Sequence, residues 1–472
     1  MTDEYDVIVL GGGPVGENVA DRAVQGGLTA VIVESELVGG ECSYWACMPS
    51  KTLLRSPQAL RAARRVGGSA EAVTGRLDVG AVLARRNEFT SHWKDDGQVS
   101  WLDSAGIALV RGHGRLSAER QVTVTLAGGG EQILTARHAV AVCTGSDAAV
   151  PAIPGLREAA PWTSREATSA QEVPPSLVVI GGGVVAVEMA TAFASLGSQV
   201  TVLARSGLLS SLESFAAELV ADGLRELGVD VRTGVDTLAV VRDDDGVTVR
   251  TDGGEVRAAE ILVATGRRPR STDIGLDVVG LKAGAPITTD DTLRVPGMDW
   301  LYAVGDVNGR VLLTHQGKYQ ARAAGDVIAA RARGEAADVA AWGRHMATAD
   351  HAAVPQVVFS EPEVAAVGLT EAAARRTRHR VRAVDVEFSS VAGASLHEDG
   401  YRGRARMVVD EDRQVLLGVT LAGPDVAELI HAAAIAVVGQ VPLKRLWHAV
   451  PSYPTMSEVW LRLLEAYGRD SA

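Results

Sequence analysis

The chain has 472 residues, of which 47% are hydrophobic, 4% aromatic and 22% charged, and its formal net charge is −12. Length and composition fit a globular protein of two or three domains and exclude a collagen, a disordered chain and a small disulfide scaffold. The acidic balance, and the lack of an apolar run of the roughly 20 residues that a membrane helix needs, predict neither nucleic acid nor membrane as a partner.

The N-terminal residues are acidic and lead directly into an apolar segment, whereas a secretory signal begins with basic residues. We therefore expect a cytoplasmic protein. The chain has three cysteines, Cys42, Cys47 and Cys143. In a large chain of this kind they suggest redox or metal chemistry rather than structural cross-links, and we predict no metal site.

A dinucleotide-binding pattern opens the chain. A predicted strand over residues 5–10 precedes the glycine-rich turn 11–16, an amphipathic helix to about Gly26, and a strand over 28–33 that leads into Glu34. The glycines allow a tight turn and let a pyrophosphate approach the helix N-terminus, and the acid is placed to bind a ribose hydroxyl. The predicted binding residues of this turn are Gly11, Gly13, Pro14, Val15 and Gly16.

The same pattern recurs about 170 residues later, which suggests a second nucleotide site. A strand over 176–180, the turn 181–186 and a strand over 199–203 form the unit, but Arg205 stands where an acid would follow. An acid would repel the 2′-phosphate of NADPH, whereas arginine can pair with it, so the sequence favours NADPH over NADH. The alternative is that Arg205 is an ordinary solvated arginine.

Further apolar strands end in features typical of a ligand site. Residues 140–145 and 261–266 each form a predicted strand that ends in a Thr-Gly turn, and the strand at 301–306 delivers Asp306. After about residue 350 the glycine pattern does not recur. Alternating strands and helices there predict an α+β domain, with strands at 356–359, 404–409 and 415–421, a short buried helix at 432–438 and a final helix at 459–467.

Cys42 and Cys47 lie in the most informative stretch of the sequence, which runs to Lys51. Five residues of regular helix rise about 7.5 Å, whereas the Cα atoms of a disulfide lie about 4.4–6.8 Å apart. The pair can therefore close only in a distorted turn, which Pro49 favours, and such strain makes a disulfide easier to reduce. The alternative is two buried cysteines in a helix.

These motifs together resemble the class I pyridine nucleotide-disulfide oxidoreductases, which include glutathione reductase, dihydrolipoamide dehydrogenase, mycothione reductase and mercuric reductase. The resemblance covers nearly the whole chain and rests on residues 11–16, 39–51, 143–145, 181–188, 264–267, 305–306 and 454–455. It implies an α/β fold with two Rossmann-like dinucleotide-binding domains, for FAD and NAD(P)H, followed by an α+β dimerisation domain. The expected domains are 1–155 (FAD, first part, with the cysteine pair), 156–275 (NAD(P)H), 276–345 (FAD, second part) and 346–472 (dimerisation).

The resemblance also implies an electron path. NADPH passes a hydride to FAD, and the reduced flavin reduces a disulfide between Cys42 and Cys47. Cys47 is then the flavin-side thiol and Cys42 the thiol that attacks the substrate. Lys51 matches the family lysine beside the flavin, and Glu188 matches its ion-pair partner.

Cofactor contacts are implied by the same resemblance. Glu34 is expected on the adenosine ribose and Asp306 near the ribityl chain of FAD. The other expected cofactor-binding residues are Gly40, Glu41, Lys51, Gly114, Thr144, Gly145, Gly181, Gly183, Val184, Val185, Glu188, Arg205, Gly266 and Thr314. Cys143 takes a place that the family gives to a small residue, and we interpret it as a buried core thiol.

The chain departs from the family near its C-terminus. Disulfide reductases of the family carry a catalytic histidine, supplied by the partner subunit, where this chain has Tyr453; the accompanying acid is present as Glu458. A phenol, with a reference pKa of about 10, is a poor base at neutral pH but can donate a proton. His448 could replace the histidine only if the backbone bends. Trp45, between the cysteines, stands where the family has a small residue.

The leading hypothesis is an FAD-dependent NADPH oxidoreductase that reduces a low-molecular-weight disulfide or another thiol-reactive acceptor through Cys42 and Cys47, as a homodimer with a shared active site. One alternative is a quinone or diaphorase-type reductase that does not use the cysteines. Another is a mercuric-reductase-like enzyme, although the sequence shows no C-terminal cysteine pair. A third is a non-catalytic redox carrier subunit.

Overall fold

The computed structural model describes residues 2–377 and 380–469 of the chain. They form two compact units, of which the first contains residues 2–49, 87–149 and 267–350 and the second contains residues 50–86, 150–266, 351–377 and 380–469. The domain limits expected from the sequence remain predictions. Residue 1 of the first expected domain and residues 378–379 and 470–472 of the last lie outside the described residues.

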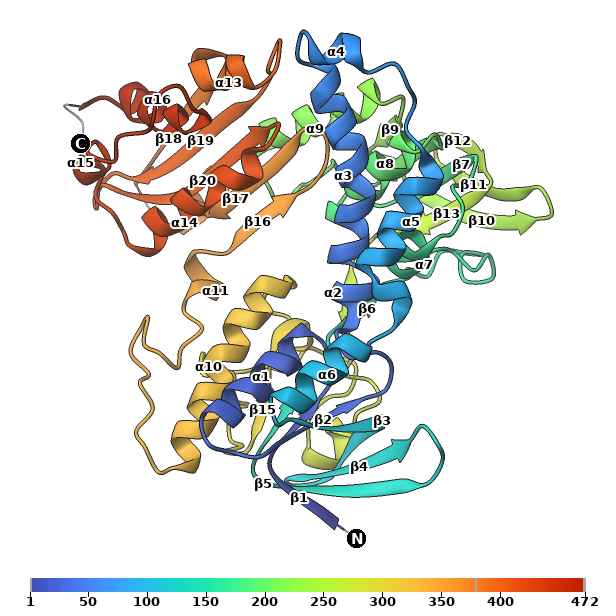
Figure 1. Ribbon diagram of the computed structural model, residues 1–472, viewed down its shortest axis with the longest axis vertical. Coiled ribbons are helices and arrows are strands. Elements are labelled where there is room, and N and C mark those ends of the chain that lie inside the picture. Colours follow the sequence, from blue (N-terminus) through green and yellow to red (C-terminus); the bar gives the residue numbers. More distant parts are fainter. Residues whose placement is uncertain (1, 378–379, 470–472) are drawn as a thin grey trace. The chain divides into compact units, whose positions relative to one another are not determined.

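A mixed sheet forms the core of the first unit (Figure 1). Its strands are β1 (Thr2–Leu10), β2 (Ala30–Glu34), β3 (Ala108–Ala118), β4 (Gln121–Leu126), β5 (Glu131–Val142) and β15 (Leu301–Ala303). β1 lies between β2 and β5 and runs parallel to both, whereas β4 runs antiparallel to β3 and β5. Val7 and Ile8 of β1 are fully buried on opposite faces, because both faces of this part of the sheet are covered.

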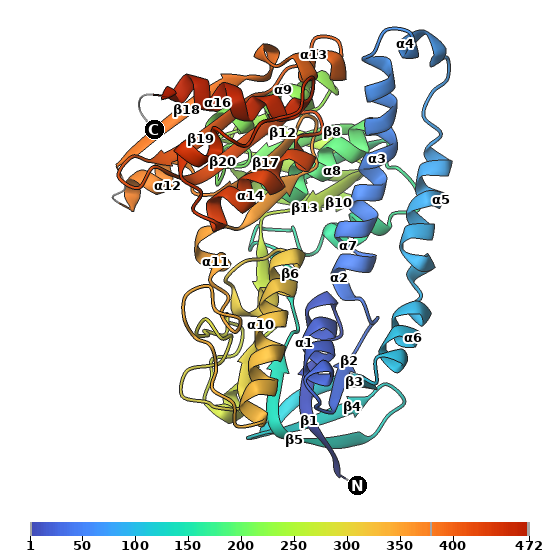
Figure 2. The ribbon, with the colours of Figure 1, turned by 60° about the vertical axis from the view of Figure 1, so that its left-hand side comes forward.

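Two long helices pack side by side in the first unit, as Figures 1 and 2 show for α1 and α10. A Cβ at Gly325 of α10 would lie 2.5 Å from Cβ of Arg22 in α1, so this close approach requires glycine. The helices and 3-10 turns of the unit are α1 (Pro14–Gln25), α2 (Gly40–Tyr44), η1 (Ser91–Trp93), α6 (Asp96–Ser104), η2 (Leu276–Val279), η3 (Gly305–Asn308) and α10 (Thr314–Ala332). α11 (Ala349–Ala352) begins in this unit, whose last residue is Asp350, and ends in the second unit.

Two short strands mark where the chain leaves the first unit and where it returns. β6 (Ser146–Ala148) and β14 (Arg267–Pro269) pair antiparallel, with Pro269 opposite Ser146. The segment between them belongs to the second unit. Both of its ends therefore pass through one small sheet.

The second unit contains the second parallel βαβ arrangement. Its sheet has the order β13 (Glu260–Val263), β7 (Ser176–Ile180), β8 (Gln199–Ala204) and β9 (Asp230–Thr233). The associated helices are α7 (Ser164–Ser169), α8 (Val184–Ser195) and α9 (Ser214–Glu226), and an antiparallel sheet of β10 (Thr237–Asp243), β11 (Gly246–Thr251) and β12 (Gly254–Ala258) follows. All residues of β7 except Ser176 are buried, as expected for a parallel strand between helices.

An antiparallel sheet with helices forms the C-terminal part of the second unit (Figure 2). Its strands, in spatial order, are β16 (Pro355–Val358), β17 (Glu363–Gly368), β20 (Val415–Gly423), β19 (Arg404–Asp410) and β18 (Val381–Glu387). Its helices and turns are α12 (Glu371–Arg376), η4 (Phe388–Ser390), α13 (Ala392–His397), η5 (Val426–Leu429), α14 (Ile430–Val438), α15 (Leu443–Leu446), η6 (Met456–Glu458) and α16 (Val459–Tyr467). The helices α3 (Cys47–Arg64), α4 (Ser69–Ala72) and α5 (Val79–Phe89) complete the list of elements.

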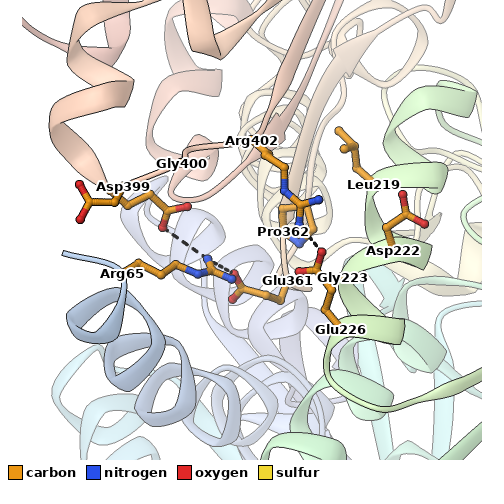
Figure 3. A pocket seen from close by; sticks show the side chains of 11 residues that line it. Arg65, Leu219, Asp222, Gly223, Glu226, Glu361, Pro362, Asp399, Gly400 and Arg402 are labelled. Carbon is orange, nitrogen blue, oxygen red and sulfur yellow. Dashed lines mark hydrogen bonds and ion pairs between the residues drawn. The ribbon is translucent and has the colours of Figure 1, made fainter. Parts of the chain in front are cut away.

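Charged residues line a cavity of about 180 Å³ in the second unit (Figure 3). Arg65, just after α3, places Nη1 2.7 Å from a carboxylate oxygen of Glu361 in the loop before β17. Arg402 forms an ion pair with Glu226 of α9. α9 approaches this loop closely because position 223 is glycine, where a Cβ would lie 1.8 Å from the carbonyl oxygen of Glu361. The cavity is thus a junction at which Glu226, Glu361 and Glu398 are paired with arginine.

Glu363 begins β17 beside this junction and is only 5% exposed. Its two carboxylate oxygens accept hydrogen bonds from Nε2 of Gln58 in α3, at 2.9 Å, and from the backbone N–H of Ala427, at 3.1 Å. Burial, together with the nearby carboxylate of Asp425, raises the pKa of Glu363 to about 7, although the two hydrogen bonds oppose the shift. Asp425 itself lies 2.9 Å from Nε2 of His397.

The predicted fold class is confirmed: the fold is α/β, with two parallel βαβ arrangements and an α+β C-terminal part. The predicted final helix 459–467 is found as α16. The expectation that residues 432–438 form a buried helix is wrong in one respect. They belong to α14, but Ile435 is 58% exposed, because none of the described residues covers the outer face of this helix. No described helix is both long and apolar enough to span a membrane.

Candidate functional site

The first glycine-rich turn is shaped by close contacts of its backbone. Gly11 has φ = +103°, which residues with a side chain rarely adopt. A Cβ at Gly16 would lie 1.9 Å from the carbonyl oxygen of Gly11, so glycine lets α1 start close to β1. At Gly13, by contrast, the nearest atom to an added Cβ is Cα of Gly40, 3.8 Å away. Open space therefore adjoins the N-terminus of α1, where Pro14 and Val15 begin the helix.

Glu34, at the end of β2, holds this turn. Its Oε2 accepts the backbone N–H of Gly12, and its Oε1 accepts the N–H of Glu36, each at 2.7 Å. Because a carboxylate has about four acceptor positions, Glu34 can still accept a ribose hydroxyl. Glu17, in the first turn of α1, has a buried Oε1 with no hydrogen-bond partner among the described residues. Open space, a spare acceptor and an unsatisfied polar atom all fit a bound FAD.

Asp306 lies in η3, directly after β15. Ser146, which is buried, donates its hydroxyl proton to Oδ2 of Asp306 at 2.5 Å and accepts a hydrogen bond from Nε of Arg267 at 2.7 Å. Arg267 also donates to the carbonyl oxygen of Ser146 at 2.5 Å. The strand pair β6–β14 thus holds the carboxylate of Asp306 in one orientation.

Other predicted FAD-site residues also lie in the first unit. Thr144 donates its hydroxyl proton to the carbonyl oxygen of Arg270 at 2.7 Å, and Gly145 follows with φ = +75°. Arg270 also donates to Oε1 of Glu41 at 3.1 Å. Gly114 lies in β3, where a Cβ would be 2.7 Å from a methyl carbon of Leu10, so its position is set by packing. These residues share a unit with Asp306 and the first glycine-rich turn.

The helix is interrupted between Cys42 and Cys47. α2 ends at Tyr44, Trp45 has φ = −137°, and α3 begins at Cys47. The predicted distorted turn is therefore present. The expectation that Pro49 causes the distortion is wrong. Pro49 lies inside the first turn of α3, where proline is well tolerated, whereas the helix is interrupted before Cys47.

The two cysteines are each partly exposed, and they differ in their surroundings. Sγ of Cys47 lies 3.4 Å from Oγ1 of Thr314, the first residue of α10, which was predicted as a cofactor contact. As the first residue of α3, Cys47 also sits at the positive end of a helix dipole, which stabilises negative charge. Cys143 is buried, as predicted, and burial raises the pKa of its thiol.

The predicted ion pair between Lys51 and Glu188 is present in the second unit. Nζ of Lys51, four residues beyond Cys47 in α3, lies 2.7 Å from Oε2 of Glu188 in α8. The other carboxylate oxygen of Glu188 accepts the backbone N–H of Phe359 at 3.0 Å. The ammonium group also lies 5.0 Å from the ring centroid of Phe359. The buried carboxylate of Glu188 is thus fully engaged by a cation and a backbone donor.

The second glycine-rich turn repeats the construction of the first. Gly181 has φ = +133°, and a Cβ there would lie 2.2 Å from the carbonyl oxygen of Ala264. Among the described residues, no atom lies within 4 Å of an added Cβ at Gly183. The N-terminus of α8, which Val184 and Val185 begin, is therefore open to a phosphate.

Two more predicted nucleotide contacts flank this turn in the second unit. Arg205 follows β8 directly, and its side chain is exposed. Gly266 has φ = +139° and lies directly before β14. Both positions leave their surroundings open to a ligand.

Tyr453 and Glu458 lie close in sequence but in different environments. Tyr453 is 77% exposed, whereas Glu458 is buried and accepts the backbone N–H of Gly393 at 3.3 Å. His448 is exposed as well.

The sequence-based prediction gave no site role to Ser146, Arg267 or Phe359, although Arg267 is among the residues that carry the family resemblance. The first two follow the two matching Thr-Gly strand ends, and this repetition was the available signal. Phe359 contacts Lys51 and Glu188 from a distant part of the chain, and its sequence neighbourhood carries no comparable signal.

Comparison with known proteins places these features in context. The family model described as pyridine nucleotide-disulphide oxidoreductase matches residues 5–326. The dimerisation-domain model of the same family matches residues 354–464.

The chain is similar along its length to several characterised proteins. It is 31% identical to a mercuric reductase of Acidithiobacillus ferrooxidans, over 99% of this chain and 83% of that protein. It is 32% identical to dihydrolipoyl dehydrogenase 2 of Haloarcula marismortui, over 97% and 95% of the two chains. Its fold matches the Cu(II) complex of the HOCl-induced flavoprotein disulfide reductase RclA from Escherichia coli, with a TM-score of 0.84, 23% identity and coverage of 98% and 99%.

Proposed function

Because the chain belongs to the pyridine nucleotide-disulphide oxidoreductase family, whose members are FAD-dependent enzymes, we propose that it oxidises NADPH and reduces a Cys42–Cys47 disulfide. The proposed final acceptor is a low-molecular-weight disulfide or another thiol-reactive oxidant. The chemistry that bound FAD supplies is transfer of an electron pair between nicotinamide and disulfide. The observation that carries the proposal is the helix break that separates Cys42 from Cys47, with Cys47 at the start of α3.

The proposed exchange with a disulfide acceptor balances at these two cysteines. Two electrons and two protons convert their disulfide into two thiols. The thiolate of Cys42 attacks one sulfur of the acceptor, which breaks the acceptor disulfide and releases one thiolate. Cys47 then attacks the sulfur of Cys42, releases the second thiolate and restores the starting disulfide. The dipole of α3 and the hydroxyl of Thr314 support a thiolate at Cys47.

The glycine-rich turn, Glu34 and Asp306 are the residues proposed to hold FAD. The open N-terminus of α1 would bind the pyrophosphate, Glu34 a ribose hydroxyl, and Asp306 the ribityl chain. Lys51 is proposed to place its positive charge near the flavin. The contacts of Glu188 with Lys51 and with the backbone of Phe359 support this role, since they fix where the ammonium group lies.

Arg205 supports the preference for NADPH. It is exposed directly after β8, where a dinucleotide-binding unit meets the adenosine ribose. No acid follows this strand to repel a 2′-phosphate, and the guanidinium group can pair with it. The second nucleotide site is accordingly proposed for NADPH, with the pyrophosphate at the N-terminus of α8.

A homodimer with a shared active site is proposed from the dimerisation domain and its surface. Ile435 and Val438 of α14 are exposed although they are apolar, and Val450 and Tyr453 are exposed nearby in sequence. A second copy of the chain would cover such a face. In that arrangement Tyr453 would reach the cysteines of the partner and donate a proton to the departing thiolate.

A quinone reductase is the second candidate function, and Tyr453 is the observation that favours it. A phenol does not accept a proton at neutral pH, so thiol exchange would lack the base that a histidine provides. Electron transfer from the flavin to a quinone needs no such base at the cysteines. This activity would survive substitution of Cys47.

An anaerobic titration with NADPH distinguishes the two functions. The wild-type subunit should take up one electron pair for FAD and a second pair for the disulfide, whereas Cys47→Ser should take up only the first. The control Cys143→Ala should behave as wild type, because this thiol is buried in the core. Uptake of a single pair by the wild type would overturn the proposal and favour the quinone reductase.

A further inference from the structure

Three successive residues before α6 adopt a backbone conformation that is unfavourable for L-amino acids. Ser91, His92 and Trp93 have φ values of 50°, 52° and 54°. Left-handed geometry costs free energy in each such residue and normally occurs at single positions. A run of three persists only where the surrounding contacts enforce it, and such strain concentrates at functional sites.

A second local rule is broken at the start of α6. Asp95 occupies the N-cap position, where aspartate normally accepts a backbone N–H of the first helical turn, but it makes no such bond. Its Oδ2 instead accepts the N–H of Val38 at 2.8 Å and a hydrogen bond from Arg111 at 2.5 Å. The carboxylate of Asp95 therefore binds the segment that leads into α2 and does not cap α6.

The same stretch holds Tyr44, the buried residue between the two cysteines. Nε1 of Trp93 donates to the carbonyl oxygen of Tyr44 at 3.1 Å. At the other end of this residue, the phenol donates to the carbonyl oxygen of Val38 at 3.0 Å and lies 3.2 Å from Oε1 of Gln98. Burial raises the pKa of Tyr44 to about 12, so the phenol stays protonated and remains a donor.

We propose that residues 91–98 form a clamp on the cysteine loop, residues 38–47, and that Trp93 and Asp95 are positioning residues for the redox-active pair. The clamp contacts the loop at Val38, before α2, and at Tyr44, where α2 ends. It therefore fixes the short helix that carries Cys42, and with it the distance over which the disulfide must close. The positive φ values of residues 91–93 and the uncapped N-terminus of α6 are unfavourable local features that accompany these contacts.

This inference rests on the proposed use of the Cys42–Cys47 disulfide, and it predicts how the pair responds when the clamp is loosened. Trp93→Phe keeps an aromatic ring but removes the N–H donor to Tyr44. When Cys42 and Cys47 are held less firmly, the effective concentration of one thiol at the other falls. Formation of their disulfide is then less favourable, so the disulfide is easier to reduce. We expect the equilibrium constant for reduction by dithiothreitol to rise about threefold to tenfold, which corresponds to about 15–30 mV.

The measurement uses the FAD-loaded, full-length protein, equilibrated with dithiothreitol buffers and analysed by thiol trapping. Trp101→Phe is the matched control, because Trp101 lies in α6 of the same unit and is 40% exposed. Its equilibrium constant should equal that of the wild type. If Trp93→Phe does not retain FAD, Tyr44→Phe provides the second test, since it removes only the phenol contacts and should shift the equilibrium in the same direction.

Values within twofold of the wild type for both clamp variants, or an equal shift in Trp101→Phe, would overturn the clamp. Equilibration with dithiothreitol requires neither NADPH nor the natural acceptor, so the clamp and the electron path can fail separately. If the wild type forms no disulfide, the proposed function fails. The clamp is then decided by the alkylation rate of Cys42 in the reduced protein, which Trp93→Phe should change and Trp101→Phe should not.

Discussion

Glu363 provides a quantitative test of the packing between α3 and the C-terminal sheet. The pKa of its carboxyl group rises from 4.5 to about 7, chiefly through burial. A difference of about 2.5 pKa units corresponds to about 3 kcal/mol, because each unit is worth about 1.36 kcal/mol. Above pH 7 the folded protein therefore holds an ionised carboxylate at this cost.

The sign of the pH dependence follows from proton binding. Between pH 4.5 and 7 the folded state keeps the proton of Glu363 and the unfolded state releases it, so stability falls as the pH rises through this window. Glu363→Gln removes this titration. Its single amide oxygen can accept from the N–H of Ala427 or from Nε2 of Gln58 but not from both, and the lost hydrogen bond lowers stability equally at every pH. The adjoining carboxylates of Asp425 and Glu361 also favour a neutral neighbour.

Thermal unfolding at several pH values measures this effect. We expect the midpoint of Glu363→Gln to gain about 3 °C relative to the wild type between pH 5 and pH 8, from about 1 °C per kcal/mol for a chain of 472 residues with an unfolding entropy of about 2.1 cal/mol/K per residue. Glu428→Gln is the matched control, since Glu428 is exposed in the adjoining turn η5 and should give no pH-dependent difference. An equal difference between Glu363→Gln and the wild type at both pH values would refute the argument.

Three further predictions concern packing, assembly and nucleotide choice. Gly223→Ala, with a Cβ 1.8 Å from the carbonyl oxygen of Glu361, should lose about 1–3 kcal/mol of stability in thermal unfolding; an unchanged midpoint would show that α9 can shift freely. Ile435→Arg should convert the proposed homodimer into a monomer in sedimentation, and a persistent dimer would place the interface elsewhere. Arg205→Leu should lower the ratio of kcat/KM for NADPH to that for NADH about tenfold, or about 1.4 kcal/mol, and an unchanged ratio would exclude contact with the 2′-phosphate.

Local patterns predicted the two glycine-rich turns well. The geometry of Gly11 and Gly181 depends on a few neighbouring residues, and glycine leaves a clear signal wherever the backbone takes a positive φ. The break between Cys42 and Cys47 was predicted for the same reason, since helix rise and disulfide geometry are local constraints.

Contacts between distant segments were accessible only through family resemblance or not at all. Lys51 and Glu188 are separated by 137 positions, and no local spacing links them. Ser146 and Asp306 are 160 positions apart, so the hydrogen bond that orients the carboxylate could not be predicted from either neighbourhood. The exposure of Ile435 was not predicted, because an apolar helix face indicates that the face will be buried but does not indicate whether the same chain or a second chain buries it.

The strand pair β6–β14 has a consequence for how the protein can be rearranged. Because the chain leaves through β6 and returns through the antiparallel β14, residues 150–266 have adjacent ends and form a cassette inserted into a hairpin. Segments with neighbouring ends are the ones that proteins tolerate exchanging. Swapping this segment between relatives at Ala149 and Gly266 would leave the Ser146–Arg267–Asp306 contacts within the recipient. The incoming segment must supply glutamate at position 188 to pair with Lys51 and glycine at position 223 to pack against Glu361.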